Sequence, residues 1–411
     1  MMRRGEALFK FSAYGFLKNL RFFEPFLYLF FLENGLSYFQ IGLLISIREV
    51  GINLLEVPTG AIADLTGRRR AMVLSFTSYI FSFLTFYFFS NFSLFVPAMV
   101  LFSLGETFRS GTHKSMIMEY LDINDMAGEQ VSYYGKTRSA SRLGSALSAL
   151  VAALIVYFRG NYNVVFLATL VPYSFDLLLM LTYPAELDGE IENPQLSLAS
   201  MKAQFFESFR SIFSTGELGR MIANASIYDS LFRIGKDYLQ PIIKTNALAL
   251  PLLASLGKDE GSTAIAIGVV YFFIYLNSFI SSRKSSTVME NLGSLSRAAN
   301  WILWIAAILF VVAGGGLLGG SILIPVVAFF FFYTLYNLRK PMVVGFLGTR
   351  VESGQRATVL SVHSQARALV GIVVAPIFGL LADKFGLASV LFAGAAALAI
   401  TGVLLEIREE G

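Results

Sequence analysis

The stretch GAIADLTGRRR, residues 60–70, joins two long apolar runs at residues 38–63 and 71–90. Each run is long enough to cross the hydrocarbon core of a bilayer as an α-helix, which takes about 20 apolar residues. Between them there is room only for a tight turn, which Gly67 permits because glycine tolerates left-handed backbone angles. The turn ends in a run of arginines, and such basic clusters stay on the cytoplasmic side of a membrane. The stretch therefore predicts two antiparallel membrane-spanning helices joined at the cytoplasmic face.

Similar apolar runs continue along the whole chain of 411 residues, of which 55% are apolar and only 15% charged. Soluble domains carry about 25% charged residues, so water is not the main solvent of this chain. The composition predicts an all-α integral membrane protein of roughly twelve spans. The runs place these spans at residues 16–33, 38–63, 71–90, 94–120, 134–158, 162–183, 218–241, 261–282, 297–316, 321–349, 356–381 and 387–407.

One long polar connection, residues 184–217, separates the first six spans from the last six. Within it, SLASMKAQFFESFRSIF has apolar residues at helical spacing, which predicts an amphipathic helix on the cytoplasmic surface. We therefore expect an N-terminal six-helix bundle over residues 1–183, a linker over 184–217 and a C-terminal six-helix bundle over 218–411.

The two halves resemble each other weakly. Asn19 and Glu24 in the first span have the same spacing as Asn224 and Asp229 in the seventh. Such internal repeats are typical of transporters built from two related bundles. Most of the basic residues outside the spans fall on one side of the predicted topology, and the opposite side carries only Arg159, Lys244, Lys258 and Lys384. This asymmetry predicts a multi-pass protein of the cytoplasmic membrane with both termini inside the cell.

The stretch at residues 60–70 resembles the signature loop of the major facilitator superfamily, in which glycine, aspartate and glycine precede basic residues. Leu65 departs from the motif, because the family usually has a basic residue there. Gly60 is expected to let helices approach closely and Asp64 to accept hydrogen bonds from a helix N-terminus. The arginines are expected to lie at the headgroups or to pair with acids on another span. The resemblance implies a role in conformational gating for Gly60, Asp64, Gly67, Arg68 and Arg69.

The same resemblance implies a twelve-span fold of two six-helix bundles related by pseudo-twofold symmetry. It implies a secondary active transporter that works by alternating access, most like the drug/proton antiporter-type efflux permeases. The expected function is proton-coupled efflux of amphipathic compounds. The alternative is a proton-coupled or facilitative transporter of a specific anionic metabolite. The proline-and-glycine pattern of the antiporter branch is missing from the fifth span, but a similar pattern occurs in the eleventh as Gly371, Pro376 and Gly379.

Ionisable groups inside a membrane are costly unless they face a cavity or a partner, so they are functional candidates. The candidates for proton coupling are Glu24, Asp229, Glu106, Arg109 and His113. Each has a structural alternative. Glu24 precedes Pro25 and could bond to backbone groups freed at a kinked helix, or pair with an arginine there. Glu106 and Arg109 could be an ion pair at i, i+3. His113 could make an ordinary hydrogen bond.

A second set of polar side chains is expected to line the substrate cavity. Arginine binds carboxylate or phosphate through paired hydrogen bonds, which favours an anionic or zwitterionic substrate. Ion pairs with Glu49, Glu56 or Glu119 would explain Arg142, Arg339 and Arg367 equally well. An amide such as Asn337 could instead bond helix to helix. The members of this set are Arg48, Glu49, Arg142, Asp176, Arg233, Asn337, Arg339 and Arg367.

Other function classes find no support in the sequence. There is no cysteine, so thiol chemistry is excluded, and two histidines are too few for a histidine-based metal centre. There is also no glycine-rich phosphate loop and no Gly-x-Ser-x-Gly motif. We therefore expect no enzyme activity, cofactor, metal or nucleic-acid partner. The expected partners are the lipid bilayer, a small-molecule substrate and protons, and the expected functional unit is a monomer.

Overall fold

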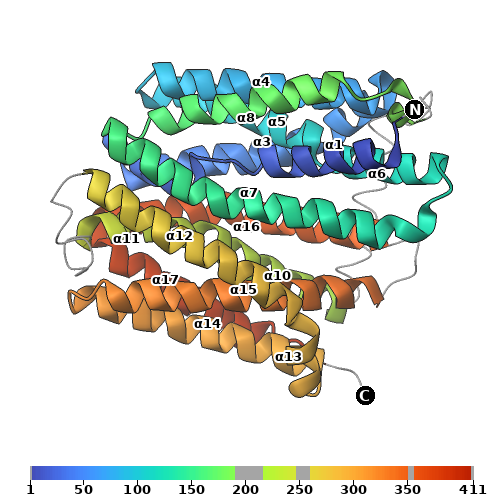
Figure 1. Cartoon of the computed structure of the whole chain (residues 1–411). Coiled ribbons are helices and arrows are strands. Elements are labelled where there is room, and N and C mark those ends of the chain that lie inside the picture. The colour runs from blue at the N-terminus through green and yellow to red at the C-terminus, as the bar shows by residue number, and fades with distance from the viewer. Residues whose placement is uncertain (1, 190–215, 247–259, 350–355, 409–411) are drawn as a thin grey trace. The chain divides into compact units, whose positions relative to one another are not determined.

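The computed structural model describes residues 2–189, 216–246, 260–349 and 356–408, and all regular structure within them is helical (Figure 1). Nine stretches of these residues are apolar and long enough to cross a membrane. This confirms the predicted all-α membrane fold. The predicted amphipathic linker helix lies outside the described residues, and the predicted domain boundaries stay a prediction.

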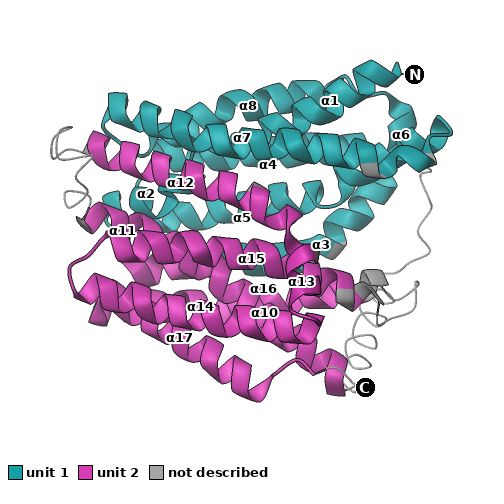
Figure 2. Ribbon diagram, turned by 60° about the horizontal axis from the view of Figure 1, so that its bottom comes forward, with its two compact units in different colours: residues 1–35, 47–198 teal, residues 36–46, 199–411 magenta. Residues whose placement is uncertain are grey.

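The chain divides into two compact units, residues 1–35 with 47–198 and residues 36–46 with 199–411 (Figure 2). One helix, α3 (Tyr38–Thr66), contributes its first turns to unit 2 and the rest to unit 1. The other helices of unit 1 are α1 (Arg4–Leu17), α2 (Leu27–Glu33), α4 (Arg68–Phe88), α5 (Phe92–Arg109), α6 (Thr112–Ile123), α7 (Gln130–Arg159) and α8 (Val164–Leu181).

Inside unit 1, α4 packs against α5 and α8, and α1 packs against α7. Two serines of α4 satisfy their hydroxyls on α5, with Ser75 Oγ 2.6 Å from the Gly105 carbonyl and Ser82 Oγ 2.8 Å from the Ala98 carbonyl. Small residues that bond to a neighbouring backbone are a usual way for membrane helices to approach closely. These contacts position the end of α5, which carries part of the site.

Two of the predicted spans in unit 1 are interrupted, which the length of the apolar runs does not indicate. The span predicted over residues 16–33 is not one helix, because α1 ends at Leu17 and the chain becomes helical again only at the 3₁₀ turn Glu24–Phe26, which leads into α2. The span predicted over 94–120 breaks between α5 and α6 at Gly111, whose φ of 79° is a conformation that favours glycine. Both breaks lie beside the cavity described below.

Unit 2 contains α10 (Gly216–Gly235), α11 (Leu239–Asn246), α12 (Glu260–Arg283), α13 (Ser285–Asn291), α14 (Leu295–Leu318), α15 (Leu323–Thr349), α16 (Arg356–Phe385) and α17 (Leu387–Leu404). The predicted span 218–241 also departs from a single α-helix, since a 3₁₀ turn at Lys236–Tyr238 separates α10 from α11. Within the unit α14 packs against α15 and α17, and α10 packs against α16.

The glycines of α16 explain part of the pattern seen in the eleventh span. A Cβ added at Gly379 would lie 2.2 Å from the Tyr38 carbonyl oxygen, and one added at Gly42 would lie 2.4 Å from the Ala375 carbonyl oxygen. The helices α3 and α16 therefore touch backbone to backbone. Asp383 completes the contact, because its carboxylate accepts hydrogen bonds from the amides of Tyr38 and Phe39 at the start of α3. In this structure Gly379 serves close packing.

Candidate functional site: a basic cavity in unit 1

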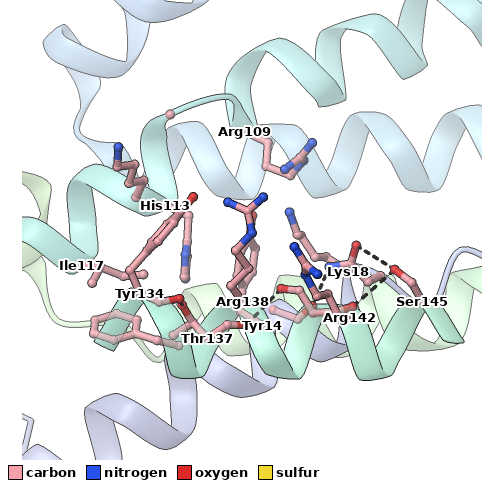
Figure 3. A pocket seen from close by; sticks show the side chains of 16 residues that line it. Tyr14, Lys18, Arg109, His113, Ile117, Tyr134, Thr137, Arg138, Arg142 and Ser145 are labelled. Carbon is pink, nitrogen blue, oxygen red and sulfur yellow. Dashed lines mark hydrogen bonds between the residues drawn. The ribbon is translucent and has the colours of Figure 1, made fainter. Parts of the chain in front are cut away.

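A cavity of about 440 Å³ opens in unit 1. Its size falls in the range of about 300–1,000 Å³ that is usual for small-molecule sites. Three parts of the chain form its wall: the end of α1, the break between α5 and α6, and the first half of α7 (Figure 3). The described residues that line it are Phe11, Tyr14, Gly15, Lys18, Asn19, Arg109, Gly111, His113, Lys114, Ile117, Tyr134, Thr137, Arg138, Ser141, Arg142 and Ser145.

Close packing of α1 on α7 forms one side of this cavity. A Cβ added at Gly15 would lie 2.8 Å from the Thr137 carbonyl oxygen, and one added at Gly144 would lie 2.5 Å from the Phe16 carbonyl oxygen. Only glycine fits at both points. The helix α1 then ends, with the Asn19 side chain donating to the Gly15 carbonyl at 2.7 Å. This end leaves Lys18 and Asn19 on the cavity wall.

The opposite side comes from the break at Gly111. The amide of Ser110 still bonds to the Glu106 carbonyl at 2.9 Å, which closes the last turn of α5, and α6 starts at Thr112. The reversal in backbone angles at Gly111 places Arg109 from the end of α5 and His113 from the start of α6 on the same cavity.

The cavity is strongly basic. Its described lining includes five lysines and arginines and no aspartate or glutamate. Figure 3 shows Lys18, Arg109, Arg138 and Arg142 directed toward one common space. Tyr134 supports two of the cations, with Lys114 Nζ 5.7 Å and the Arg138 guanidinium carbon 6.0 Å from its ring centre. Of the lining residues, the sequence had predicted only Arg109, His113 and Arg142 as site residues.

Glu106 lies just behind the lining and pairs with two arginines. Its two carboxylate oxygens are each 2.5 Å from a guanidinium nitrogen, one of Arg21 and one of Arg109. Arg109 Nε also donates to the Tyr79 hydroxyl at 3.2 Å. The predicted pairing of Glu106 with Arg109 is therefore confirmed. Because one carboxylate faces two guanidinium groups, the cluster of Arg21, Glu106 and Arg109 keeps a net positive charge at the cavity.

His113 is buried between aromatic rings. Its imidazole stacks on Tyr14 with a centroid separation of 3.6 Å, and its Nε2 lies 3.1 Å from the Tyr183 hydroxyl oxygen. The structure thus supplies the ordinary hydrogen bond that was the alternative to a proton relay. The relay itself stays a prediction.

Four other predicted residues of unit 1 are not among the described lining residues. Arg48 and Glu49 pair with each other, with 3.0 Å between guanidinium and carboxylate. Glu24 lies in the 3₁₀ turn that follows the break in α1. Asp176 on α8 is fully buried, and neither of its carboxyl oxygens has a hydrogen-bond partner among the described residues.

The predicted residues of unit 2 form a separate polar group. Arg339 is 1% exposed, donates to Asn224 and to the Ala299 carbonyl, and lies over the Tyr228 ring at 4.3 Å. Asp229 lies 3.7 Å from His363 Nε2.

The other predictions in unit 2 find local contacts. Asn337 donates to Ser278 on α12 at 3.0 Å, which is the helix-to-helix bond that was its alternative. Arg367 donates to Ser364 at 3.0 Å, and Arg233 lies in the last turn of α10. Glu119, one of the acids considered as a partner for these arginines, binds Arg68 at 2.9 Å.

The signature loop is held by residues of unit 1. Gly67 has a φ of 94°, which confirms the tight turn, and Asp188 accepts a hydrogen bond from the Arg69 amide at 2.6 Å. The pairing of Arg68 with Glu119 confirms the expectation that these arginines meet acids on another span. At Gly60 an added Cβ would meet no atom within 4 Å among the described residues, so the close approach expected there stays a prediction. Asp64 is exposed.

Four basic residues of this region were not predicted from the sequence: Lys18, Arg21, Lys114 and Arg138. A signal was available for Lys18 and Arg21, because both stand inside the apolar run 16–33 that was predicted to cross the membrane. Lys114 and Arg138 lie near predicted span ends, where basic residues are ordinary. Only the folded arrangement of α6 and α7 shows that they face the same cavity.

Comparison with known proteins gives consistent results. Residues 13–375 match the family model of the Major Facilitator Superfamily. The chain is 22% identical over 399 residues to the uncharacterized MFS-type transporter YxaM of Bacillus subtilis (strain 168), covering 94% of this chain and 91% of the relative. Its fold is similar to that of the nucleoside transporter NupG, with a TM-score of 0.77, 11% identity and coverage of 98% and 99%. It is also similar to a D-xylose-proton symporter, with a TM-score of 0.71, 14% identity and coverage of 98% and 97%.

Proposed function

This chain belongs to the major facilitator superfamily, and we propose that it carries a small anionic solute across the membrane by alternating access. It is a multi-pass membrane transporter of small molecules and not an enzyme. The solute class is the new element of the proposal. We further propose that it works as a monomer. The distribution of basic residues supports a place in the cytoplasmic membrane with both termini inside the cell.

The observation that carries the proposal is the charge of the cavity lining. Five basic side chains and no acidic one face a space of about 440 Å³ among the described residues. At 4 Å and an effective dielectric constant of about 20, two unit charges attract by about 4 kcal/mol. A carboxylate or phosphate entering this space therefore gains a large favourable interaction, and a cation meets repulsion of the same size.

The arrangement of the basic groups suits an anion with planar or tetrahedral oxygens. Arg138 and Arg142 are four residues apart on α7, so their side chains lie on one face of the helix. Lys18 and Arg109 reach the same space from α1 and α5 (Figure 3). Guanidinium groups bind carboxylate and phosphate through two parallel hydrogen bonds, which fixes the orientation of the solute.

The alternative of proton-coupled efflux of amphipathic compounds has weaker support from this cavity. Aromatic side chains do line it, namely Phe11, Tyr14 and Tyr134. Efflux substrates that carry a positive charge would need an acidic group at the site, and the described lining contains none. We therefore place a specific anionic metabolite ahead of an amphipathic compound.

The test is substrate counterflow in proteoliposomes of the purified protein. The panel contains dicarboxylates, sugar phosphates, neutral nucleosides, D-xylose and cationic drugs. We expect exchange of at least one anion and none of the neutral or cationic compounds. Preferential exchange of a neutral or cationic compound would overturn the proposal.

Two variants then place the solute in the cavity. Arg142→Gln removes a charged donor, and hydrogen bonds to charged groups contribute about 1.5–3 kcal/mol, so the anion affinity should fall about 10-fold or more. Arg159→Gln is the matched control, because Arg159 is the last residue of the same helix and is not among the described residues that line the cavity. Equal affinities in the two variants would remove the cavity as the binding site.

A further inference from the structure

The wall of the basic cavity offers a solute little apolar surface. Phe11, Tyr14, His113 and Ile117 line the cavity, but their neighbours bury them to 0%, 4%, 6% and 2% exposure. The imidazole of His113 stacks on the Tyr14 ring, so packing already uses these two faces. Of the described aromatic rings in the lining, only that of Tyr134 is exposed. An apolar body would therefore add little to the affinity of a solute.

The side-chain hydroxyls of the wall are already bonded within the protein. Those of Thr137, Ser141 and Ser145 on α7 lie 3.0–3.3 Å from carbonyl oxygens of the preceding turn of the same helix. A hydroxyl has a single proton to donate, so toward a solute these three groups can only accept a hydrogen bond. The basic side chains thus supply most of the donors, and the wall suits anionic groups better than a hydroxyl-rich body.

Two of the basic side chains follow each other along α7. Arg138 and Arg142 are one turn apart, which is about 6 Å along the helix axis at a rise of 1.5 Å per residue. Arg138 is exposed, whereas Arg142 is partly buried. The cavity therefore presents positive charge at an outer and at an inner level.

A lysine accompanies each of these arginines. At the outer level Lys114, which is also exposed, shares the Tyr134 ring with Arg138. At the inner level Lys18, partly buried like Arg142, reaches the same space from the end of α1 (Figure 3). The level of Lys18 is fixed by the next residue in the chain, Asn19, whose Oδ1 accepts from Ser145 Oγ at 3.4 Å.

We call Lys18 and Arg142 the inner pair, and Lys114 and Arg138 the outer pair. The fifth cation of the lining, Arg109, is paired with Glu106 and belongs to neither. A solute with one anionic group can neutralise one pair only. The other pair then keeps two like charges that repel each other and lack a counter-charge from any described lining residue.

We propose that the cavity selects compact dianions whose two charges sit on separate groups of a small polar skeleton, as in dicarboxylates. The inner pair holds one carboxylate and the outer pair holds the other. Each arginine can donate two parallel hydrogen bonds to its carboxylate, and each lysine adds a point charge. The inference rests on the proposed function and names the class of its substrate.

The experiment compares dicarboxylates with their half-amides, in which a neutral amide of nearly the same shape replaces one carboxylate. The ligands are malonate, succinate, glutarate, adipate and the half-amide of each. Their affinities for the detergent-purified full chain are measured by calorimetry at about pH 8, where every carboxyl group is ionised. We expect one length to bind most tightly. At that length the dicarboxylate should bind about 10-fold or more tightly than its half-amide, because hydrogen bonds between charged groups are the strong ones.

Two substitutions separate the levels. Arg138→Gln should lower the ratio of dicarboxylate to half-amide affinity to about 1, because the outer pair then loses its bidentate donor. Arg142→Gln should weaken the binding of both ligands, because both place a carboxylate on the inner pair. The matched control is Arg159→Gln, a change of the same kind at the last residue of α7, which should keep the affinities of the wild type. Thermal unfolding of each variant shows that it is folded.

The outcomes distinguish this inference from the proposed function. Equal affinities of dicarboxylates and half-amides at every length would overturn the inference alone, as would an unchanged ratio in Arg138→Gln. Sulfate carries both of its charges on one group, so sulfate binding as tight as that of the best dicarboxylate would also overturn it. The same holds if the wild type binds none of the dicarboxylates but exchanges another anion in the counterflow panel. A folded wild type that neither binds nor exchanges any anion would overturn the proposed function as well.

Discussion

Replacement of Glu106 by glutamine should destabilise unit 1 strongly. Glu106 separates the guanidinium groups of Arg21 and Arg109, and the three side chains are only 19%, 22% and 15% exposed, so solvent screens them weakly. With charges about 4 Å apart and an effective dielectric constant of about 20, each pair has roughly 4 kcal/mol of Coulomb attraction. Part of this is offset by desolvation, and removal of one partner of a buried pair costs about 3–5 kcal/mol. We expect Glu106→Gln to lower the free energy of unfolding by that amount.

The measurement is equilibrium unfolding in mixed micelles, followed by tyrosine and tryptophan fluorescence. A second substitution, Arg21→Gln, removes one of the two guanidinium groups left facing each other. The double variant should therefore be about 1–3 kcal/mol more stable than the sum of the single effects predicts. Glu119→Gln is the control, since the Arg68–Glu119 pair is 26% and 30% exposed and should contribute about 1 kcal/mol or less. A Glu106→Gln protein within about 1 kcal/mol of the wild type, or strictly additive effects, would refute this account.

Three further substitutions test local features. Gly67→Ala should cost about 1–2 kcal/mol in thermal unfolding because its φ of 94° strains any side chain, whereas Gly60→Ala, where a Cβ meets open space, should be neutral or slightly stabilising. Arg339→Lys should lower the unfolding temperature of the protein, because lysine cannot both stack on a ring and donate to Asn224 and a carbonyl; an unchanged temperature would contradict this. Asp383→Ala should speed amide hydrogen exchange in the segment 36–42, because it removes the carboxylate that accepts from the first amides of α3. Protection equal to the wild type would show that these two hydrogen bonds are dispensable.

The membrane fold was predictable because it depends on the bulk property of apolar length. Runs of about 20 apolar residues predict spans wherever they stand, and turns such as the one at Gly67 need a special backbone angle that glycine marks in the sequence. The interruptions of these spans were not predictable from the same signal. The breaks after Leu17 and at Gly111 lie inside the predicted spans 16–33 and 94–120, and hydropathy averages over the polar residues beside each break. Pro25 and Gly111 were the available hints, but both residues also occur in unbroken membrane helices.

The site was predictable only in part, for a related reason. The position of a charged residue in the sequence shows whether it lies in a predicted span. Two charged residues three apart in one helix are also neighbours on its surface, which is why the pair Glu106–Arg109 could be predicted. It does not show which helices converge. The four missed cations come from the region of α1, α6 and α7, whose side chains meet only through the glycine contacts of α1 with α7 and the turn at Gly111. Cavity residues assigned by depth alone, such as Arg48 and Glu49, turned out to satisfy each other.

The charges of unit 1 thus fall into two groups with different consequences for transport. Pairs whose partners lie in the same unit, such as Arg68–Glu119 and the cluster around Glu106, persist as long as the unit keeps its fold. A unit that rocks as a rigid body carries such pairs along unchanged, so they stabilise it without sensing solute or access. We expect the lining cations outside that cluster, namely Lys18, Lys114, Arg138 and Arg142, to change partners when a solute binds or leaves, whereas Arg109 lines the cavity and is paired with Glu106. Substitutions at Glu106 should therefore act on stability and those at Arg142 on affinity, and an effect of Glu106→Gln on affinity without loss of stability would assign the cluster to the transport cycle instead.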